Sequence, residues 1–410
     1  MTPTTSRLMA GAALTILASG AAAQQSTEQR IAAFEERISE LEGQQSTGSQ
    51  TDFSFGDEVA TTVEVYGYVK VDAFYDFDQE LGNSTFPLYN LTADAPQDGY
   101  FGATANQTRI GLNATTPTEI GDLLINIETD FYGGENAFGT GDEGFRLRAA
   151  SGSLNGFLIG KDWTTFLTVA AYPITLDFQG IAGIPFTRQE QIRYTHDFTD
   201  AVSADFAIEE SNANSDDPSY VAAVAYDTDS LLVRLSGIYG SVDGATNSRS
   251  DPDADPVETQ FEDVESWGLS LATSLSVWEG GTLNASYTYG KGIASYMVFL
   301  GSDIDENGDP IELQAAYASL TQEVGDSLTL RGMIGYRDND SGPIARAAGT
   351  NGLFADDAGT QSLTSYHLNA EYEIVENTIL GVEYFHGTVD KFDSDDFSVN
   401  RLQTAVTFSF

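Results

Sequence analysis

Apolar and polar residues alternate with a period of two over most of the chain beyond residue 62. In the segment 63–74, Val, Gly and Ala occupy one set of alternate positions, and Glu, Tyr, Lys, Asp and Phe occupy the other. The same period returns at 123–131, 267–277 and 402–410. A period of two places successive side chains on opposite faces of a β-strand. The pattern therefore predicts strands with one apolar face and one polar face that also carries aromatic residues.

The segments between these strands fall into two classes that alternate along the chain. Short turns rich in Gly, Asn, Asp and Pro, the residues of tight hairpins, are expected at 117–122, 155–156, 197–201, 227–230, 279–281, 324–326 and 375–377. Long or very polar stretches lie near 79–98, 132–142, 163–187, 210–219, 240–263, 290–310, 338–361 and 388–396. Seven short and eight long connections predict 16 antiparallel strands. An even number of strands, with short turns on one side and long loops on the other, is typical of outer-membrane barrels.

The composition agrees with a closed barrel that crosses a membrane. The mean hydropathy is only −0.20 although 11% of residues are aromatic, as expected when every second strand residue faces lipid. Closure leaves no unpaired sheet edge inside a bilayer. The last strand ends with Phe408 and Phe410 on one face, which is the pattern read by the outer-membrane assembly machinery. The sequence predicts an all-β transmembrane barrel over residues 62–410, located in the bacterial outer membrane among its lipid and lipopolysaccharide.

Three segments are expected before the barrel. Residues 1–23 combine Arg7, a short apolar run and a small-residue end, which is typical of a signal peptide removed after secretion. Residues 24–43 predict a periplasmic coiled-coil helix, whose core positions are Ile31, Phe34, Ile38 and Leu41. Two heptads are too short to be stable alone, which favours a homotrimer, while a helix folded onto its own barrel is the alternative. Residues 44–61 are predicted to be a flexible linker.

The charge excludes one class of function and leaves another open. A formal net charge of −44 repels nucleic acid, so no nucleic-acid partner is expected. The acids concentrate in predicted loops, where solvated surface is the default interpretation. The segment 303–309 imitates the start of a calcium loop, but the twelfth position is Gln314 rather than Glu. Calcium bound in the acidic loops is therefore an alternative, and no other cofactor is expected.

Nothing in the sequence indicates catalysis. The three histidines, His196, His367 and His386, show no metal-ligand spacing, so no metal site is predicted. No G-x-S-x-G or similar nucleophile motif is present. The chain is therefore not expected to be an enzyme.

A barrel of 16 strands leaves an aqueous lumen, and a selective pore must narrow it. The connection 163–187 is unusually apolar for an exposed loop, and an apolar loop avoids water by packing inside the barrel. We interpret it as an inward-folded constriction loop, with contact to a neighbouring subunit as the alternative. Its candidate constricting residues are Trp163, Phe166, Tyr172 and Phe178.

Basic residues gather in the sequence around this loop. The candidate pore and anion-binding residues are Arg109, Arg146, Arg148, Lys161, Arg188 and Arg193. Arg146, Arg148 and Arg193 share the polar positions of their strands, and an arginine facing lipid at the midplane would cost roughly 2–4 kcal/mol. Arginines lining a pore attract anions. Acids on the same faces, including Glu128 and Asp130, are candidates to pair with these arginines.

Three motifs carry a resemblance to a known family. The run from Thr187 to Thr195, the G-K-D-W-T-T-F stretch from Gly160 to Phe166, and Gln107 to Gly111 resemble the DcaP-like porins of Gram-negative bacteria. The resemblance implies a 16-stranded trimer with a periplasmic coiled coil, which takes up small anionic solutes such as dicarboxylates. It also makes Arg109, Arg188 and Arg193 the expected anion contacts. The large net negative charge of this chain is where it departs from that family pattern, and it argues against a strong preference for anions.

Two alternatives to an anion-favouring passive channel stay open at this point. One is a general porin without anion preference. The other is a structural or adhesive barrel that conducts no solute. Measured conductance and its ion selectivity would distinguish the three.

Overall fold

The computed structural model describes residues 49–54, 60–83, 95–133, 144–213, 215–243, 262–298, 301–305, 307–342, 359–392 and 396–410. The predicted signal peptide 1–23 and the predicted helix 24–43, with its core positions Ile31, Phe34, Ile38 and Leu41, lie outside the described residues, as do residues 244–261 of the polar stretch 240–263. Among the described residues, no helix is long and apolar enough to span a membrane.

The described residues form β-strands joined by turns and loops. The strands are β1 (Ser49–Ser54), β2 (Ala60–Asp76), β3 (Tyr100–Thr104), β4 (Arg109–Thr118), β5 (Gly121–Asp130), β6 (Arg146–Leu154), β7 (Phe157–Trp163), β8 (Arg188–Thr199), β9 (Val202–Glu209), β10 (Ser219–Asp227), β11 (Leu231–Val242), β12 (Val264–Trp278), β13 (Gly281–Lys291), β14 (Glu312–Val324), β15 (Leu328–Asn339), β16 (Thr360–Val375), β17 (Thr378–Lys391) and β18 (Phe397–Ser409). Two short 3-10 helices lie in loops, η2 (Val169–Ala171) and η3 (Ala294–Tyr296).

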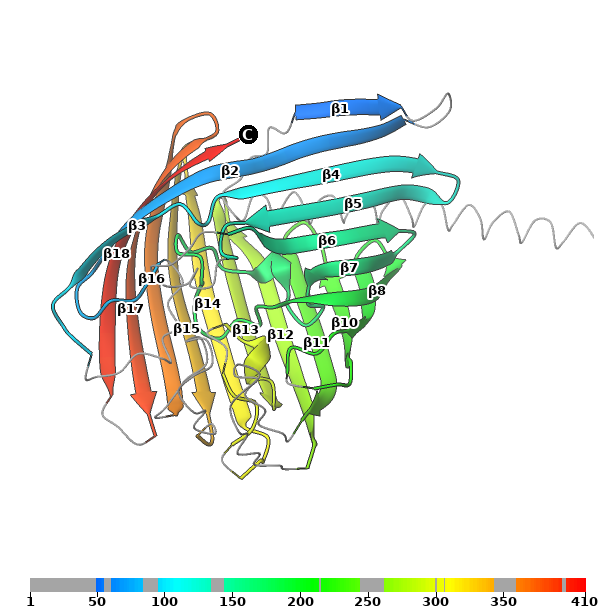
Figure 1. Ribbon diagram of the computed structural model, residues 1–410. Coiled ribbons are helices and arrows are strands. Elements are labelled where there is room, and N and C mark those ends of the chain that lie inside the picture. The colour runs from blue at the N-terminus through cyan, green and yellow to red at the C-terminus, as the bar shows by residue number, and fades with distance from the viewer. Residues whose placement is uncertain are drawn as a thin grey trace, which may run out of the picture.

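Antiparallel pairing closes the strands into a single barrel (Figure 1). From β4 to β18 each strand pairs with the next, and β18 pairs with β2 to complete the ring. Strands β3 and β4 both pair with β2, so they act as one wall strand interrupted at residues 105–108. With β1 outside the ring, the barrel has the 16 strands that the alternation of short turns and long loops predicted.

Strand β1 and the C-terminus share one edge of β2. Residues 62–68 of β2 pair with β4 on one side, so β1 and β18 must pair with its other side. Phe410 forms two backbone hydrogen bonds with Gly67, which lies next to residues 60–65, the stretch of β2 that pairs with β1. Figure 1 shows β1 and the C-terminus near the same end of β2. The predicted linker 44–61 is therefore not irregular throughout, because it contains a strand that covers the edge of β2 beyond β18.

Gly67 is required by close approach rather than by turn formation. Its φ is +152°, and a Cβ there would lie 2.3 Å from the carbonyl oxygen of Arg109 and 3.1 Å from the ring of Phe410. Phe408 and Phe410 expose 49% and 42% of their surfaces on the outside. The terminal aromatics that we interpret as an assembly signal thus lie on the outer face, and a residue without a side chain accommodates the last of them.

The two faces of the wall differ as the period of two predicts. On β2, Val69 and Val71 are exposed on the outside, whereas Lys70 and Asp72 between them are buried in the interior. The same contrast recurs on β10, where burial alternates along the strand. The apolar face is turned toward lipid. The polar face lines the lumen and can bind the loops that fold into it.

Candidate functional site: the constriction and its charged walls

The loop between β7 and β8, residues 164–187, is closed at its neck and folds inward. The amide of Thr164 donates to the carbonyl of Thr187 at 3.0 Å, which holds the two ends of the loop together. Phe166 is fully buried near this neck, packed among residues of β9 to β11 and of η3. We call residues 164–187 the constriction loop.

Near its first half, the constriction loop is bound by side chains of β11 and β14. The hydroxyl of Ser236 donates to the carbonyl of Phe166 at 2.8 Å, and Tyr317 donates to the carbonyl of Ala171 at 2.9 Å. Arg234 donates to the loop carbonyls as well, while paired with Asp205. Both strands therefore hold the loop by donating to its backbone.

The tip of the constriction loop reaches the other side of the barrel. Glu383 of β17 accepts a hydrogen bond from the amide of Leu176 at 2.9 Å, and Lys70 of β2 donates to the carbonyl of the same residue. Ser365 of β16 accepts from the amide of Ala182 at 2.8 Å. Contacts with β11, β14, β16, β17 and β2 mean that the loop crosses the lumen, so the chain between β7 and β8 narrows the channel.

A second loop, residues 292–311, packs against the constriction loop. The amide of Phe186 donates to the carbonyl of Tyr296 at 2.8 Å, and the amide of Val298 donates to the carbonyl of Ile184 at 2.7 Å. In this second loop, the carboxylate of Asp305 accepts from the amides of residues 307 and 309. Asp305, one of the acids of the calcium-like segment, is thus engaged in holding its own turn.

Three arginines meet two carboxylates on the inner face of β4, β5 and β6. Arg148 forms ion pairs with Glu128 at 2.6 Å and with Asp130 at 3.1 Å. Arg146 forms one with Asp130 at 2.5 Å, and Arg109 lies 3.7 Å from Glu128. Arg109 and Arg148 are almost fully buried, whereas the side chain of Arg146 is 27% exposed. The predicted pairing of arginines with acids on the same face is present here.

Arg188, at the start of β8, joins this group. Its guanidinium carbon lies 3.4 Å from the centre of the Trp163 ring, which is a cation–π contact. It interacts electrostatically with Arg109, Arg146, Arg148 and Glu128, and its Nη2 forms no hydrogen bond with any described residue. We call Arg109, Arg146, Arg148 and Arg188 the arginine cluster. Four guanidinium groups around Glu128 and Asp130 leave an excess of two positive charges.

Aromatic residues of the constriction loop lie against the arginine cluster. The guanidinium carbons of Arg146 and Arg148 are 5.0 and 5.6 Å from the centre of the Phe178 ring. Tyr172 stacks on Phe186, with ring centres 5.7 Å apart. Two of the predicted constricting residues, Tyr172 and Phe178, therefore lie beside the charges, whereas Trp163 stacks on Arg188 and Phe166 lies at the neck.

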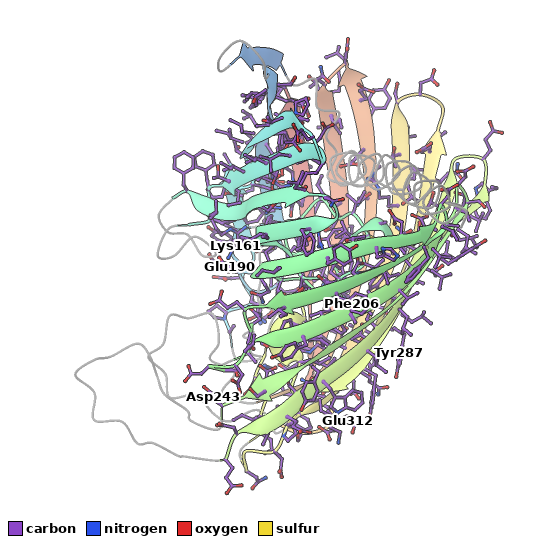
Figure 2. All side chains as sticks on the ribbon, turned by 90° about the vertical axis from the view of Figure 1, so that its right-hand side faces the viewer. Lys161, Glu190, Phe206, Asp243, Tyr287 and Glu312 are labelled. Atoms are coloured by element: carbon purple, nitrogen blue, oxygen red, sulfur yellow. The ribbon has the colours of Figure 1, made fainter. Side chains whose placement is uncertain are left out.

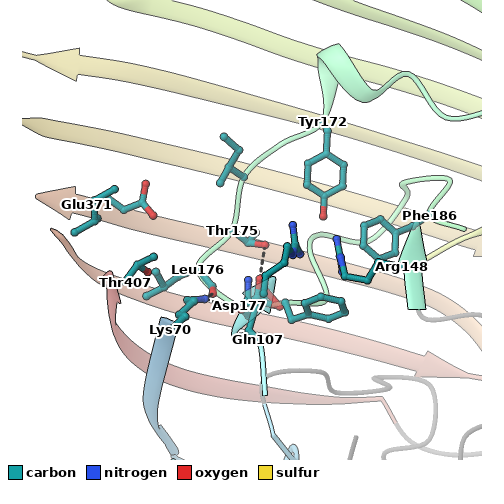
Figure 3. Close-up of a pocket in the computed structure, with 14 residues that line it drawn as sticks. Lys70, Gln107, Arg148, Tyr172, Thr175, Leu176, Asp177, Phe186, Glu371 and Thr407 are labelled. Atoms are coloured by element: carbon teal, nitrogen blue, oxygen red, sulfur yellow. Dashed lines mark hydrogen bonds between the residues drawn. The ribbon is translucent and has the colours of Figure 1, made fainter. Parts of the chain in front are cut away.

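An open pocket lies between the constriction loop and the wall (Figure 3). Its empty volume is about 600 Å³. It is lined by Lys70, Gln107, Arg109, Arg148, Tyr172, Ile174, Thr175, Leu176, Asp177, Phe178, Phe186, Glu371, Ile379 and Thr407. Figure 3 shows Tyr172, Phe186 and Arg148 on one side, with Lys70, Leu176 and Glu371 on the other. Two members of the arginine cluster, Arg109 and Arg148, thus border open space beside the constriction loop.

The two remaining basic candidates lie apart from the arginine cluster. Arg193 shares the inward positions of β8, but it pairs with Asp162 at 3.3 Å. Lys161 lies on the outer face, which corrects its assignment to the pore. It alternates in step with the exposed Phe157 and Ile159, and pairs across the strands with Glu190, which is 54% exposed. Figure 2 shows Lys161 and Glu190 on adjacent strands of this face.

Several residues of the site were not singled out from the sequence. Lys70 and Arg234 hold the constriction loop, although neither stands near it in the sequence. Asp177, His367 and Glu383 come together beneath the loop tip, although the histidines show no ligand spacing in the sequence. The register of β16 and β17 could have indicated part of this group, because it places Asn369 opposite Glu383, two residues from His367.

Known structures share this fold. The DcaP outer-membrane channel of Acinetobacter baumannii matches with a TM-score of 0.69 at 21% identity, over 85% of this chain and 97% of that one. OmpT of Vibrio cholerae matches with a TM-score of 0.56 at 15% identity, over 87% and 99%. An anion-selective porin from Comamonas acidovorans matches with a TM-score of 0.54 at 14% identity, over 85% and 100%. At these identities the matches establish the fold alone.

The family is established by sequence. None of the curated proteins compared with the chain matches it. The family model described as DcaP outer membrane protein matches residues 28–410, which is nearly the whole chain and includes every strand of the barrel. This chain therefore belongs to the DcaP outer membrane protein family.

Proposed function

We propose that this outer-membrane protein is a passive porin whose constriction favours small anions, dicarboxylates among them. The observation that carries the proposal is the excess of two positive charges in the arginine cluster, beside an open pocket. A guanidinium group can bind a carboxylate through two parallel hydrogen bonds. Fixed positive charges in a narrow lumen raise the local concentration of anions and lower their entry barrier.

The path of a solute follows from the position of the constriction loop. The loop crosses the lumen between β7/β8 and β16/β17 and its tip is bonded to the wall, so a solute must pass beside the loop, where the pocket lies. There it meets Arg148 and Tyr172 on one side and Lys70 on the other (Figure 3). Of the arginine cluster, Arg146 is the expected first contact, because its side chain is 27% exposed whereas Arg109 and Arg148 are more deeply buried.

The working form is proposed to be a homotrimer with the predicted helix 24–43 in the periplasm. One solved OmpT structure from Vibrio cholerae is described as a trimer form, and the heptad spacing of residues 31–41 supports association of several copies. The channel needs no catalytic residue in this proposal, since diffusion down a gradient performs the transport.

Planar lipid bilayers and proteoliposomes test this function. The purified protein should produce stepwise currents, and liposomes containing it should swell faster in a four-carbon dicarboxylate than in a neutral solute of equal size. Equal swelling rates would support a general porin without anion preference. Silent bilayers together with non-swelling liposomes would contradict the channel and favour a structural or adhesive barrel.

A further inference from the structure

Asp177, His367 and Glu383 form a compact donor group under the tip of the constriction loop. Nδ1 of His367 lies 3.2 Å from Oε1 of Glu383 and 3.9 Å from Oδ1 of Asp177. The three donor atoms all lie within 4.8 Å of one another. Each side chain is at most 1% exposed. Among the described residues, this is the one group of three metal-ligating side chains in such proximity.

Both carboxylates are held by hydrogen bonds, and each turns one oxygen, Oδ1 of Asp177 and Oε1 of Glu383, toward Nδ1 of His367. Oδ2 of Asp177 accepts from the amide of Gly180, whereas its Oδ1 forms no hydrogen bond with any described residue. Oε2 of Glu383 accepts from Asn369 at 2.9 Å and from the amide of Leu176. Hydrogen bonds to the outer oxygens orient ligating carboxylates in metal sites. The free Oδ1 of Asp177 is thus a buried acceptor that faces a histidine nitrogen and a second carboxylate.

The charge balance of the group calls for a cation. Two ionised carboxylates exceed the one positive charge that His367 can supply, and a buried charge without a partner is costly. A divalent ion would neutralise the group completely.

The spacing and the route of access fit a small transition-metal ion. Zinc binds imidazole nitrogen and carboxylate oxygen at about 2.1 Å, which separates tetrahedral donors by about 3.4 Å, close to both separations from Nδ1 of His367. Asp177 also lines the open pocket, so the group can be reached from the lumen (Figure 3). The ring of His367 packs against Phe385, with ring centres 4.9 Å apart, which fixes its orientation.

We propose that Asp177, His367 and Glu383 bind one divalent transition-metal ion such as Zn²⁺. Asp177 belongs to the constriction loop, while His367 and Glu383 belong to β16 and β17. The bound ion fastens the tip of the loop to the wall. The site does not depend on anion selectivity, since its ligands are separate from the arginine cluster.

Calorimetric titration of the purified full-length protein with ZnCl₂ tests the site. The protein is first stripped with EDTA, and excess Mg²⁺ is present to occupy acidic loops that prefer hard cations. We expect one tight Zn²⁺ per chain. His367→Gln and Asp177→Asn should each weaken binding at least about tenfold, since even loss of a supporting residue costs that much. His386→Gln is the matched control, because His386 of the same barrel bonds Asn400 outside the group.

A second readout is the visible absorption of bound Co²⁺. The stripped wild-type protein should give ligand-field bands characteristic of a low-coordinate site, and His367→Gln should abolish them. Heat-modifiable migration on gels shows whether each variant has folded. If His367→Gln in the wall prevents folding, Asp177→Asn still tests the site, because it changes only the loop. Absence of tight Zn²⁺ binding in the wild type, or equal binding by wild type and Asp177→Asn, would overturn the site.

Discussion

The two sides of the lumen use buried charge in different ways. On β4, β5, β6 and β8, four arginines surround two carboxylates, and positive charge is in excess within this group. On β16 and β17, the carboxylate of Glu383 is occupied with backbone amides of the constriction loop and with Asn369. The arginine side presents excess positive charge that can act on a solute. The carboxylate on the other side is engaged in hydrogen bonds within the protein.

This difference separates selectivity from geometry. An excess of one sign of charge beside open space acts on mobile ions through its electric field. A carboxylate whose oxygens accept backbone hydrogen bonds instead fixes the position of a loop. Substitutions on the arginine side should therefore change which ions pass, and substitutions on the side of Glu383 should change how wide and how steady the channel is.

The largest effect is expected from Glu383→Ala. The amides of Leu176 and Asp177 lose their acceptor, and each unsatisfied buried group costs roughly 1–3 kcal/mol. The loop tip should detach, so single-channel conductance and current noise should both increase. Glu371→Ala is the matched control, because Glu371 also faces the pocket but bonds Arg331 rather than the loop. Conductance that is identical in wild type and Glu383→Ala would refute the anchoring role.

The next effect concerns selectivity. The double variant Arg146→Ala, Arg188→Ala removes the excess positive charge and keeps Arg148 between Glu128 and Asp130. A unit charge about 8 Å from an ion in water contributes about 0.5 kcal/mol, or roughly twofold in occupancy for each arginine at low salt. Zero-current potentials in a KCl gradient should shift toward cation preference, with little change in conductance. An unshifted potential would remove these two residues from the selectivity site.

A smaller effect is expected from Phe178→Leu. The ring lies against Arg146 and Arg148, and each cation–π contact of a buried pair contributes about 1–2 kcal/mol. Leucine keeps the apolar packing but not the quadrupole, so the arginine side chains become less fixed while their charge stays. We expect a weaker block of the current by dicarboxylates with an unchanged KCl zero-current potential. A shift of that potential comparable to the double arginine variant would contradict this division.

The smallest effect is expected from Lys161→Ala on the outer face. The Lys161–Glu190 pair is largely exposed, and such pairs contribute about 0–1 kcal/mol. The barrel wall screens it from the lumen, so conductance and zero-current potential should equal those of the wild type. A changed potential would return Lys161 to the pore.

The barrel itself could be predicted because its signal is local and repeated. The period of two at 63–74 and the turn residues at 155–156 each determine a strand or a hairpin without reference to the rest of the chain. Strand β1 was missed because five of its six residues are polar, so the segment resembled a linker. The interruption at 105–108 was missed because a bulge adds residues without interrupting the composition of a strand.

The site was predictable only where alternation was clear. Arg146 and Arg148 oppose Leu147, so their inward direction could be inferred. Lys161 follows a nearly continuous apolar run, Phe157 to Gly160, in which no face can be distinguished. The contacts of Glu383 and Lys70 with the constriction loop depend on the position that this irregular segment takes inside the barrel. No periodicity encodes that position, so these contacts needed the structure.

The central claim is that the constriction carries excess positive charge that acts on passing ions. Its most direct test is the zero-current potential of the wild-type protein in a planar bilayer that separates dilute from concentrated KCl. The account predicts a potential whose sign shows chloride to be more permeant than potassium, with the preference decreasing as the salt concentration on both sides is raised. A potential whose sign shows potassium to be the more permeant ion would contradict it.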